Sequence, residues 1–402
     1  MTKHSPLCRI LPLLCLFTLL CSSACFQDTF PDTVPLPVES VPGDGFATPS
    51  GTHEITLVFV NAGKADCILV LADEHLYCVD TGLDTSVEKI AFCMGSLGKS
   101  TIDGVFFTHG DRDHIGGYPA LSALFPVTQT YAPWYAEDPT VFTALDGAVE
   151  FLQAGISVPI GEEGLYLDVL APLSRNADDN NNSLILRLTS GETTILLTGD
   201  MCADEREALL AAYPDTLHAD VWKAPYHGRE GSVTKELLDA VSPRYSFVCA
   251  DTETNPDSAA PACMELLEAV SEVYRTDEAT LGWKLTVSPD GTIAVEELCP
   301  AAERESSLVI AEIDPNTQSF TIGNTGERAD LSGCIVTIAP AGILYRIPDG
   351  TILEKGASVT IGSKEASLWW QTEEKLLRKK KSDTISLYDP AGCLLATAES
   401  NS

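Results

Sequence analysis

Runs of apolar residues divide the chain into two regions with different patterns. In the first region, about residues 54–298, short β-rich runs alternate with helix-like stretches. Strands are expected over 54–60, 66–72, 102–108, 127–133, 165–172, 183–189, 193–199, 220–225 and 245–250, and helices over 86–97, after Gly117, and over 203–213 and 233–241. Hairpin-rich sheets interleaved with helices predict two sheets covered by helices, an αββα sandwich.

The second region, residues 307–398, has a different pattern. Short apolar runs such as 308–313, 319–324 and 384–389 are separated by turn residues, and little of the sequence has a helical period. This pattern predicts an all-β sandwich. The whole chain is therefore expected to be an α+β protein of two domains.

The N-terminus has the pattern of an export signal. Lys3 and Arg9 precede a short apolar run, and small residues stand before Cys25, so residues 1–24 are expected to be a signal peptide. The sequence Ser-Ser-Ala-Cys resembles a bacterial lipobox, which would make Cys25 a lipidation site; a plain secretory signal cut near Ala24 is the alternative. The expected location is extracellular, either secreted or anchored to the outer face of the cytoplasmic membrane as a lipoprotein, with membrane contact only through that lipid. Residues 26–51 are rich in Pro, Gly, Ser and Thr and are expected to be a linker.

The charge of the chain limits its partners. There are 58 acidic residues against 25 basic ones, a net charge of −33. Such a surface repels polyanions at long range. Tight nonspecific binding of nucleic acid is therefore excluded unless a local cationic or metal site supplies the attraction.

The segment Thr108–Gly117 carries the strongest chemical signal. His109, Asp111, Asp113 and His114 follow directly after a buried strand, so their side chains are expected on a loop at the end of that strand. Two imidazoles and two carboxylates within six residues are unfavourable unless a cation holds them together. A polar surface loop with two incidental histidines is the alternative.

Two more candidate ligands follow apolar strands. Asp200 ends the run ILLTGD, where it could bridge two metal ions, although it could also cap the following helix. His227 follows another apolar strand, in the segment KAPYHG. Asp80, in VDTG, is expected to be a structural carboxylate behind the ligands. His53, His75 and His218 are expected to be surface residues.

These segments together resemble the metallo-β-lactamase superfamily, whose motif is His-x-His-x-Asp-His followed by a distant Asp and His. The likeness is strongest to the hydrolase domain of ComEC-like competence (DNA-uptake) proteins, which read roughly DVGQGD, HxDxDHIGG, LLTGD and KxxHHG. Here the counterparts are 61–66, 109–117, 196–200 and 223–228. The resemblance covers about residues 54–297 and implies the αββα metallo-β-lactamase fold.

The resemblance also implies a site with two divalent metal ions, Mn²⁺ or Zn²⁺. His109 and Asp111 would hold the first ion and Asp113, His114 and His227 the second, with Asp200 bridging. A metal-bridging hydroxide would be the nucleophile, and Asp113 would be the catalytic residue that orients it. Lys223 would assist an anionic substrate, with a structural salt bridge as the alternative.

The sequence departs from the family pattern at several positions. No histidine occurs between His114 and His218, so the third histidine of the first metal site has no counterpart, and one of the asparagines 180–182 could approach that position. A site short of nitrogen and rich in oxygen favours Mn²⁺ or Mg²⁺ over tightly held Zn²⁺. Tyr226 and Asn61 also replace a histidine and an aspartate, which affects the substrate more than the metal site.

Residues 307–398 resemble a lamin-tail domain, an immunoglobulin-like sandwich, at segments such as 309–313 and 387–392. The resemblance implies a positioning module whose surface or cell-wall partner is unknown. The basic run 378–381 could contact a phosphate chain, but a solvated loop is the simpler interpretation.

The predicted function is an exported metal-dependent hydrolase of phosphodiesters, with DNA among its substrates. Two alternatives stay open. One is a hydrolase of lactams, lactones or thioesters, and the other is a surface binding protein whose altered site has lost turnover.

Overall fold

The structure is a computed structural model that describes residues 45–145, 147–363, 366–370 and 375–400. The predicted signal peptide 1–24, the lipidation residue Cys25 and most of the linker 26–51 lie outside the described residues. Within the described ranges, none of the helices combines the length and apolar character that a membrane crossing requires.

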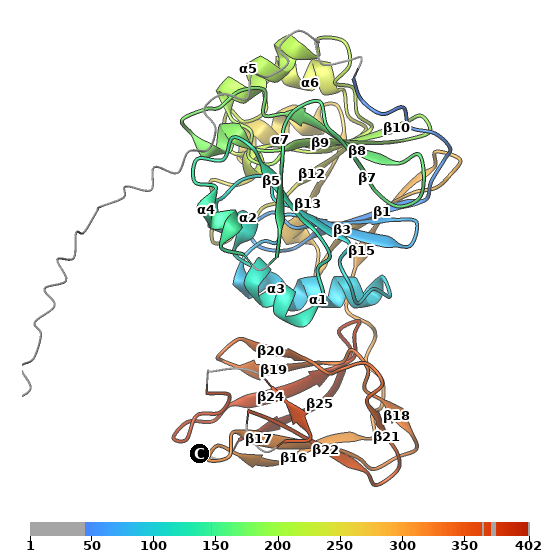
Figure 1. Ribbon diagram of the computed structural model, residues 1–402, viewed down its shortest axis with the longest axis vertical. Helices are drawn as coiled ribbons and strands as arrows, with labels where there is room; N and C mark the ends of the chain where they lie inside the picture. Colours follow the sequence, from blue (N-terminus) through green and yellow to red (C-terminus); the bar gives the residue numbers. More distant parts are fainter. Residues whose placement is uncertain (1–44, 146, 364–365, 371–374, 401–402) are drawn as a thin grey trace, which may run out of the picture. The chain divides into compact units, whose positions relative to one another are not determined.

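Two sheets form the centre of the first region (Figure 1). The first sheet has the order β15 (Ile293–Leu298), β14 (Gly282–Val287), β1 (Ile55–Val60), β2 (Ile68–Ala72), β3 (His75–Val79), β4 (Gly104–Phe106), β5 (Thr130–Pro133) and β6 (Val149–Leu152). The second has the order β13 (Glu272–Arg275), β12 (Tyr245–Val248), β11 (Val221–Lys223), β10 (Thr193–Leu197), β9 (Ile185–Ser190), β8 (Tyr166–Ala171) and β7 (Ser157–Pro159).

Helices cover the outer faces of both sheets. They are α1 (Val87–Ser96), α2 (Arg112–Ile115), α3 (Tyr118–Leu124), α4 (Thr140–Thr143), α5 (Ala203–Ala212), α6 (Lys235–Val241) and α7 (Pro261–Glu268). Figure 1 shows α1 and α3 against the first sheet and α5, α6 and α7 against the second. The helices expected over 86–97, after Gly117, and over 203–213 and 233–241 are thus confirmed as α1, α3, α5 and α6.

The side chains of β1 show why both faces of this sheet are buried. Leu57 and Phe59 belong to the apolar cluster between the two sheets, which includes Leu197 and Phe247. Val58 and its neighbours on the other side lie in the cluster that α1 and α3 complete. Successive strand residues point to opposite faces, so a continuous apolar run suits a strand covered on both sides. The αββα sandwich is confirmed.

The region after Leu308 consists of strands and turns, and its described residues contain no helix. One sheet orders β16 (Leu308–Asp314), β17 (Ser319–Asn324), β22 (Ser358–Gly362) and β23 (Leu368–Trp369), and another orders β20 (Ile343–Arg346), β19 (Ile335–Ala339), β24 (Thr384–Tyr388) and β25 (Leu394–Glu399). A third pairs β18 (Ala329–Asp330) with β21 (Ile352–Leu353). Phe320, Val336 and Leu387 share one apolar core. The all-β expectation is confirmed, and the lamin-tail resemblance stays a prediction.

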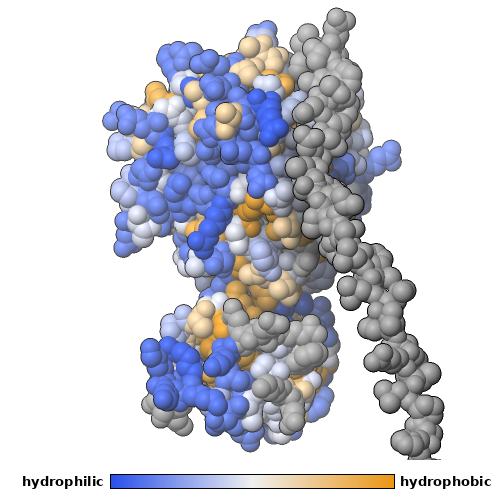
Figure 2. All heavy atoms as spheres, turned by 60° about the vertical axis from the view of Figure 1, so that its left-hand side comes forward, coloured by the Kyte–Doolittle hydropathy of each residue, from blue (hydrophilic) through white to orange (hydrophobic). Residues whose placement is uncertain are grey.

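The sheet topology brings the candidate site residues to one edge. Strands β10, β11 and β12 are parallel, so their C-terminal ends lie side by side. Asp200 follows β10 and His227 follows β11, while the segment 108–114 follows β4 of the other sheet. Because loops at the ends of parallel strands are where α/β proteins place ligands, this edge is the natural position for a site. On the face shown in Figure 2, the surface of the first region as a whole is mostly hydrophilic, in keeping with the acidic composition.

Candidate metal centre

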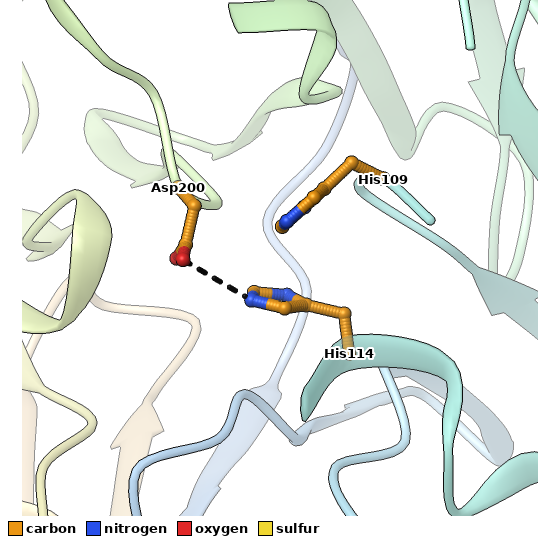
Figure 3. Close-up of side chains that lie close together, drawn as sticks. All are labelled: His109, His114 and Asp200. Atoms are coloured by element: carbon orange, nitrogen blue, oxygen red, sulfur yellow. Dashed lines mark ion pairs between the residues drawn. The ribbon is translucent and has the colours of Figure 1, made fainter. Parts of the chain in front are cut away.

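Three separate stretches of the chain place their side chains around one point. Asp200 Oδ2 lies 3.4 Å from His114 Nε2 and 3.1 Å from His227 Nε2. The rings of His109 and His114 have centroids 4.0 Å apart. Figure 3 shows His109 and His114, from the first of these stretches, and Asp200, from the second, directed toward one another. The groups His109–His114–Asp200 and Asp113–His114–His227 each bring three potential metal-ligating atoms within 4.8 Å of one another.

The ligand atoms of this cluster lack ordinary partners. Nε2 of His109, His114 and His227 and Oδ1 of Asp200 are buried and accept or donate no hydrogen bond among the described residues. Buried polar atoms without a hydrogen bond are unfavourable and rare. Several such atoms aimed at one point, three of them imidazole nitrogens and one a carboxylate oxygen, are the donor set that a divalent cation satisfies. The residues therefore fit a metal site.

Asp111 and Asp113 lie at the more open side of the cluster. Asp113 Oδ2 is 3.5 Å from His227 Nε2, and its side chain is 23% exposed. Asp111 Oδ2 is 3.6 Å from His109 Nε2, but that side chain is 56% exposed. The structure thus brings all six predicted ligands together, with Asp111 at the margin.

Lys64 adds a cation to the open side. Its Nζ lies 3.2 Å from Asp113 Oδ2. Sequence analysis did not single out Lys64, although it occupies the fourth position of the 61–66 motif, where the relatives' pattern has Gln. A lysine beside the predicted catalytic carboxylate places a positive charge where an anionic substrate would approach.

Electrostatics in the metal-free protein favour charged histidines and ionised carboxylates. Burial alone would lower the pKa of His114, but the charges of Asp200 and Asp80 outweigh it and raise that pKa well above its usual value. The same holds for His227, where burial is outweighed by the nearby carboxylates of Asp200 and Asp113. In return the two histidines hold the pKa of Asp200 well below its ordinary value against the effect of burial. The negative charge of the carboxylates is therefore balanced by protons on the histidines, and a metal ion can replace these protons.

Asp80 lies behind His114, as the sequence predicted for a structural carboxylate. Its Oδ2 accepts a hydrogen bond from His114 Nδ1 at 2.8 Å and another from Thr108 Oγ1 at 2.7 Å, and Oδ1 accepts from Thr108 N at 2.7 Å. Asp80 is fully buried and has a positive φ of 57°. The carboxylate fixes the tautomer that leaves His114 Nε2 free for a metal.

Replacing Asp80 by asparagine is expected to lower metal affinity and turnover by about 10- to 100-fold, because partners behind a ligating histidine have effects of this size. Asparagine tolerates the left-handed backbone of this position, so the fold should be retained. Metal titration and turnover of the variant check the effect. Asp103→Asn is the control. Asp103 Oδ1 lies 3.1 Å from His75 Nδ1, which is the same kind of contact, and neither residue belongs to the metal centre.

The backbone around His227 is unusual. Tyr226 and His227 both have positive φ, 50° and 52°, and His227 Nδ1 donates to the carbonyl of Cys249 at 3.1 Å. Non-glycine residues in this conformation are uncommon and are kept where the surrounding structure requires them. Here the turn aims Nε2 of His227 at Asp200. Tyr226 stacks instead with the Arg229 guanidinium, 4.8 Å from its ring centroid.

The asparagines proposed for the missing histidine are largely engaged elsewhere. The Asn182 side chain exchanges hydrogen bonds with the Asn176 backbone, and Asn181 Oδ1 accepts from Glu205 N at 3.1 Å. Ser183 is the residue of this stretch that reaches the site: its Oγ lies 3.4 Å from His109 Nδ1 and accepts from Asp200 N at 3.3 Å. For Asn180 alone, the role of replacing the missing histidine stays a prediction, because its Oδ1 is buried and has no hydrogen-bond partner among the described residues.

Lys223 does not lie where it could bind a substrate, contrary to the prediction from the sequence. It is completely buried, and its Nζ donates to Gly199 O at 2.7 Å, pairs closely with Asp66 Oδ2 and lies 3.7 Å from Asp200 Oδ1. Burial alone would lower its pKa, but the charges of Asp66 and Asp200 raise it above the usual value. The substrate role is therefore wrong, and the alternative of a structural salt bridge is what the structure shows.

Asp66 is the site residue that sequence analysis missed. It is 1% exposed, and its Oδ1 lies 3.4 Å from His227 Nδ1. Asp66, Asp200 and His227 form another group able to hold a metal ion. The signal was present, because Asp66 is the last residue of the 61–66 motif and aligns with the final Asp of DVGQGD.

Replacing Lys223 by methionine is expected to destabilise the protein by about 3–5 kcal/mol, because it leaves the Asp66 carboxylate buried without its counter-charge. Urea unfolding of the metal-free protein measures the effect. The double variant Lys223→Met/Asp66→Asn should recover part of the loss, and Lys235→Met on an exposed helix should lose less than about 0.5 kcal/mol. A fully stable Lys223→Met would contradict the structural role.

Comparison with known proteins agrees with the family resemblance. The profile described as the metallo-beta-lactamase superfamily matches residues 60–252. The chain is 28% identical over 197 residues to Competence protein ComA of Neisseria gonorrhoeae, covering 48% of this chain and 27% of that protein. It is 28% identical over 188 residues to ComE operon protein 3 of Bacillus subtilis, covering 45% and 24%. The match thus spans about a quarter of these relatives.

A solved structure with a similar fold is the metallo-beta-lactamase fold protein YhfI from Bacillus subtilis. It is 14% identical, has a TM-score of 0.40, and the match covers 58% of this chain and 99% of that one. The family profile and the competence relatives confirm the resemblance that the motifs indicated.

Proposed function

Because the chain carries a metallo-beta-lactamase domain, we propose that it is an exported, metal-dependent hydrolase of phosphodiester bonds, with nucleic acid as its substrate class. The observation that carries the proposal is the convergence of four buried ligand atoms that make no hydrogen bond among the described residues, from His109, His114, His227 and Asp200. One of these relatives is named as a competence protein, and the DNA-related process of competence supports nucleic acid as the substrate.

His109 and Asp111 would hold one metal ion, Asp113, His114 and His227 a second, and Asp200 would bridge them. Ions held there would lower the pKa of a bound water and neutralise charge on the substrate oxygens. The oxygen-rich first site favours Mn²⁺, with Zn²⁺ as the alternative.

The protein's own groups supply position and proton transfer. Asp113 is partly exposed and lies between His227 and Lys64, so its carboxylate can orient an attacking water and accept its proton. Against the effect of burial, the close His227 ring and the charge of His114 hold the pKa of Asp113 well below its usual range. Lys64 can donate a hydrogen bond to a phosphoryl oxygen. A phosphodiester therefore matches the charge of the open side better than a neutral lactam does.

Turnover with a panel of substrates tests the proposal. Bound metal is measured first, and then hydrolysis of bis(p-nitrophenyl) phosphate, single-stranded DNA, a cephalosporin and an acyl thioester is followed with Mn²⁺ and with Zn²⁺. We expect two ions per chain and hydrolysis of the phosphodiesters. Hydrolysis of the cephalosporin or thioester alone would replace the proposal with the second enzyme class, and stoichiometric metal without turnover would favour a binding protein.

Export is tested separately. Cell fractionation with labelled fatty acid should find the mature chain outside the cytoplasm, and Cys25→Ser should abolish the label if that residue is lipidated. A cytoplasmic chain of full length would contradict this part of the proposal.

A further inference from the structure

A second binding feature lies beside the metal centre. It is a pocket of about 470 Å³, lined by the loop 61–63 after β1, by Ser86 and Lys89 at the start of α1, and by Asp251 and Thr252 after β12. Nearly all of its lining residues are polar or charged. None of them takes part in the candidate metal cluster, so the pocket is not explained by the proposed catalytic residues.

Two walls of the pocket lead directly to the metal centre. The loop 61–63 continues into Lys64, whose ammonium contacts Asp113. On the other wall, Asp251 follows two residues after Cys249, whose carbonyl accepts the hydrogen bond from His227 Nδ1. Two walls of the pocket are therefore joined along the chain to residues that contact the metal cluster.

Lys89 is the free cation of this pocket. Its side chain is half-buried and has no hydrogen bond or ion pair with any described residue, whereas Arg275 on the same wall pairs with Asp277 at 3.1 Å and Glu278 at 3.0 Å. Burial lowers the pKa of Lys89 from its usual value. A partly desolvated ammonium without a partner favours an anionic ligand.

Of the three acidic residues that line the pocket, Asp251 and Asp277 are already engaged, whereas Glu253 is exposed and has no hydrogen bond or ion pair with any described residue. Both Asp251 oxygens accept hydrogen bonds from Thr254, from its N at 3.1 Å and closely from its Oγ1. Asp277 Oδ2 accepts from Thr252 N at 2.8 Å and from Thr252 Oγ1 at 2.6 Å. Their remaining capacity for a cation is reduced, while the ammonium of Lys89 keeps all of its donors.

We propose that this pocket binds the phosphate that neighbours the scissile one along a phosphodiester chain, with Lys89 as its recognition residue. The inference rests on the proposed phosphodiesterase function and makes it more specific: substrates with two or more phosphates are preferred to a lone diester. In a chain with net charge −33, a local cation of this kind supplies attraction that the surface as a whole denies to a polyanion.

The test compares the full-length, Mn²⁺-loaded protein with Lys89→Ala, Lys89→Arg and the surface control Lys235→Ala. Kinetics are measured with bis(p-nitrophenyl) phosphate, which has one phosphate, and with a short oligothymidylate. Binding of a labelled oligothymidylate is measured independently at several salt concentrations. Lys89→Ala should raise KM for the oligonucleotide about tenfold or more, leave kcat and the single-phosphate substrate unchanged, and reduce the salt slope of binding by about one.

The outcomes separate the two proposals. Lys89→Arg should keep most of the affinity, and Lys235→Ala should keep all of it. Cleavage of both substrates with no change in Lys89→Ala overturns the subsite but not the phosphodiesterase. Oligonucleotide binding that depends on Lys89 without any turnover supports the subsite and overturns the phosphodiesterase. An oligonucleotide that neither binds nor is cleaved overturns both.

Discussion

Asp200→Ala is expected to lower phosphodiester turnover at least about a thousandfold and to release bound metal. Among the described residues, Asp200 is the one carboxylate within 3.4 Å of both His114 and His227, and it is the predicted bridge between two ions. Metal ions supply several kcal/mol of transition-state stabilisation, and each 1.36 kcal/mol is a factor of ten in rate. Loss of the bridge should therefore affect metal binding and rate together.

The measurement is metal content after dialysis combined with kcat on bis(p-nitrophenyl) phosphate. Asp204→Ala is the matched control, because Asp204 lies on the same stretch, is exposed and has no hydrogen bond or ion pair with any described residue. Circular dichroism and urea unfolding show whether Asp200→Ala is folded. A folded Asp200→Ala with full metal content and normal turnover would remove Asp200 from the centre, and with it the proposed two-ion arrangement.

Asp200→Asn distinguishes charge from shape. Asparagine keeps one oxygen at the same position but removes the negative charge that balances the two histidines. If the bridge acts mainly through charge, Asn should be nearly as damaging as Ala. If metal content survives in Asn and is lost in Ala, one neutral oxygen is enough to hold an ion.

The strand ends of the fold were predictable because each apolar run stops at a polar motif. The runs before His109, Asp200 and His227 became β4, β10 and β11, and their loops meet at one edge. By contrast, α7, β14 and β15 were not predicted. In β15 the buried pattern is weak, with alternate residues half-exposed, and α7 is only eight residues long. Its start, Pro261 at the first helical position, was the available signal.

The roles of Lys223 and Asp66 could not be separated from the sequence. A lysine at the end of an apolar strand is equally compatible with an exposed strand end and with a buried ion pair. The deciding fact is that Asp66, far away in the sequence, lies against its ammonium. Long-range pairing of this kind comes from the two sheets packing together, which no local pattern records. Four of the predicted ligands, His109, Asp111, Asp113 and His114, were easier to identify because they lie within one short segment.

Metal affinity is expected to rise steeply with pH. A histidine must be neutral at Nε2 to ligate a metal, while in the metal-free protein Asp200 and its neighbours raise the pKa of His114 and His227 above 6.5 despite burial. Each proton displaced by the metal contributes up to about a tenfold change in affinity per pH unit. With both rings protonated, affinity should therefore change by up to about 100-fold per unit, from pH 6 upward.

Isothermal titration of Mn²⁺ between pH 6 and 8, in buffers of different ionisation enthalpy, counts the released protons. Asp80→Asn removes one of the charges that raise the pKa of His114, so its affinity should change less steeply with pH even though it binds more weakly. Affinity independent of pH in the unaltered protein would mean that the histidines are neutral before binding, contrary to their carboxylate surroundings.

The stability of the metal-free protein should follow the opposite trend. Because the folded pKa values of His114 and His227 are raised above the unfolded value, their protonation stabilises the fold fully below about pH 6.5, and this stabilisation is lost as pH rises through the folded values. Chelated protein should accordingly unfold at lower urea concentration at pH 8 than at pH 6, and Mn²⁺ should restore stability most at pH 8. The two trends have one cause, since protons and metal ions compete for the same buried nitrogens. A chelated protein that is more stable at pH 8 than at pH 6 would show that other groups dominate, and the link between the two measurements would fail.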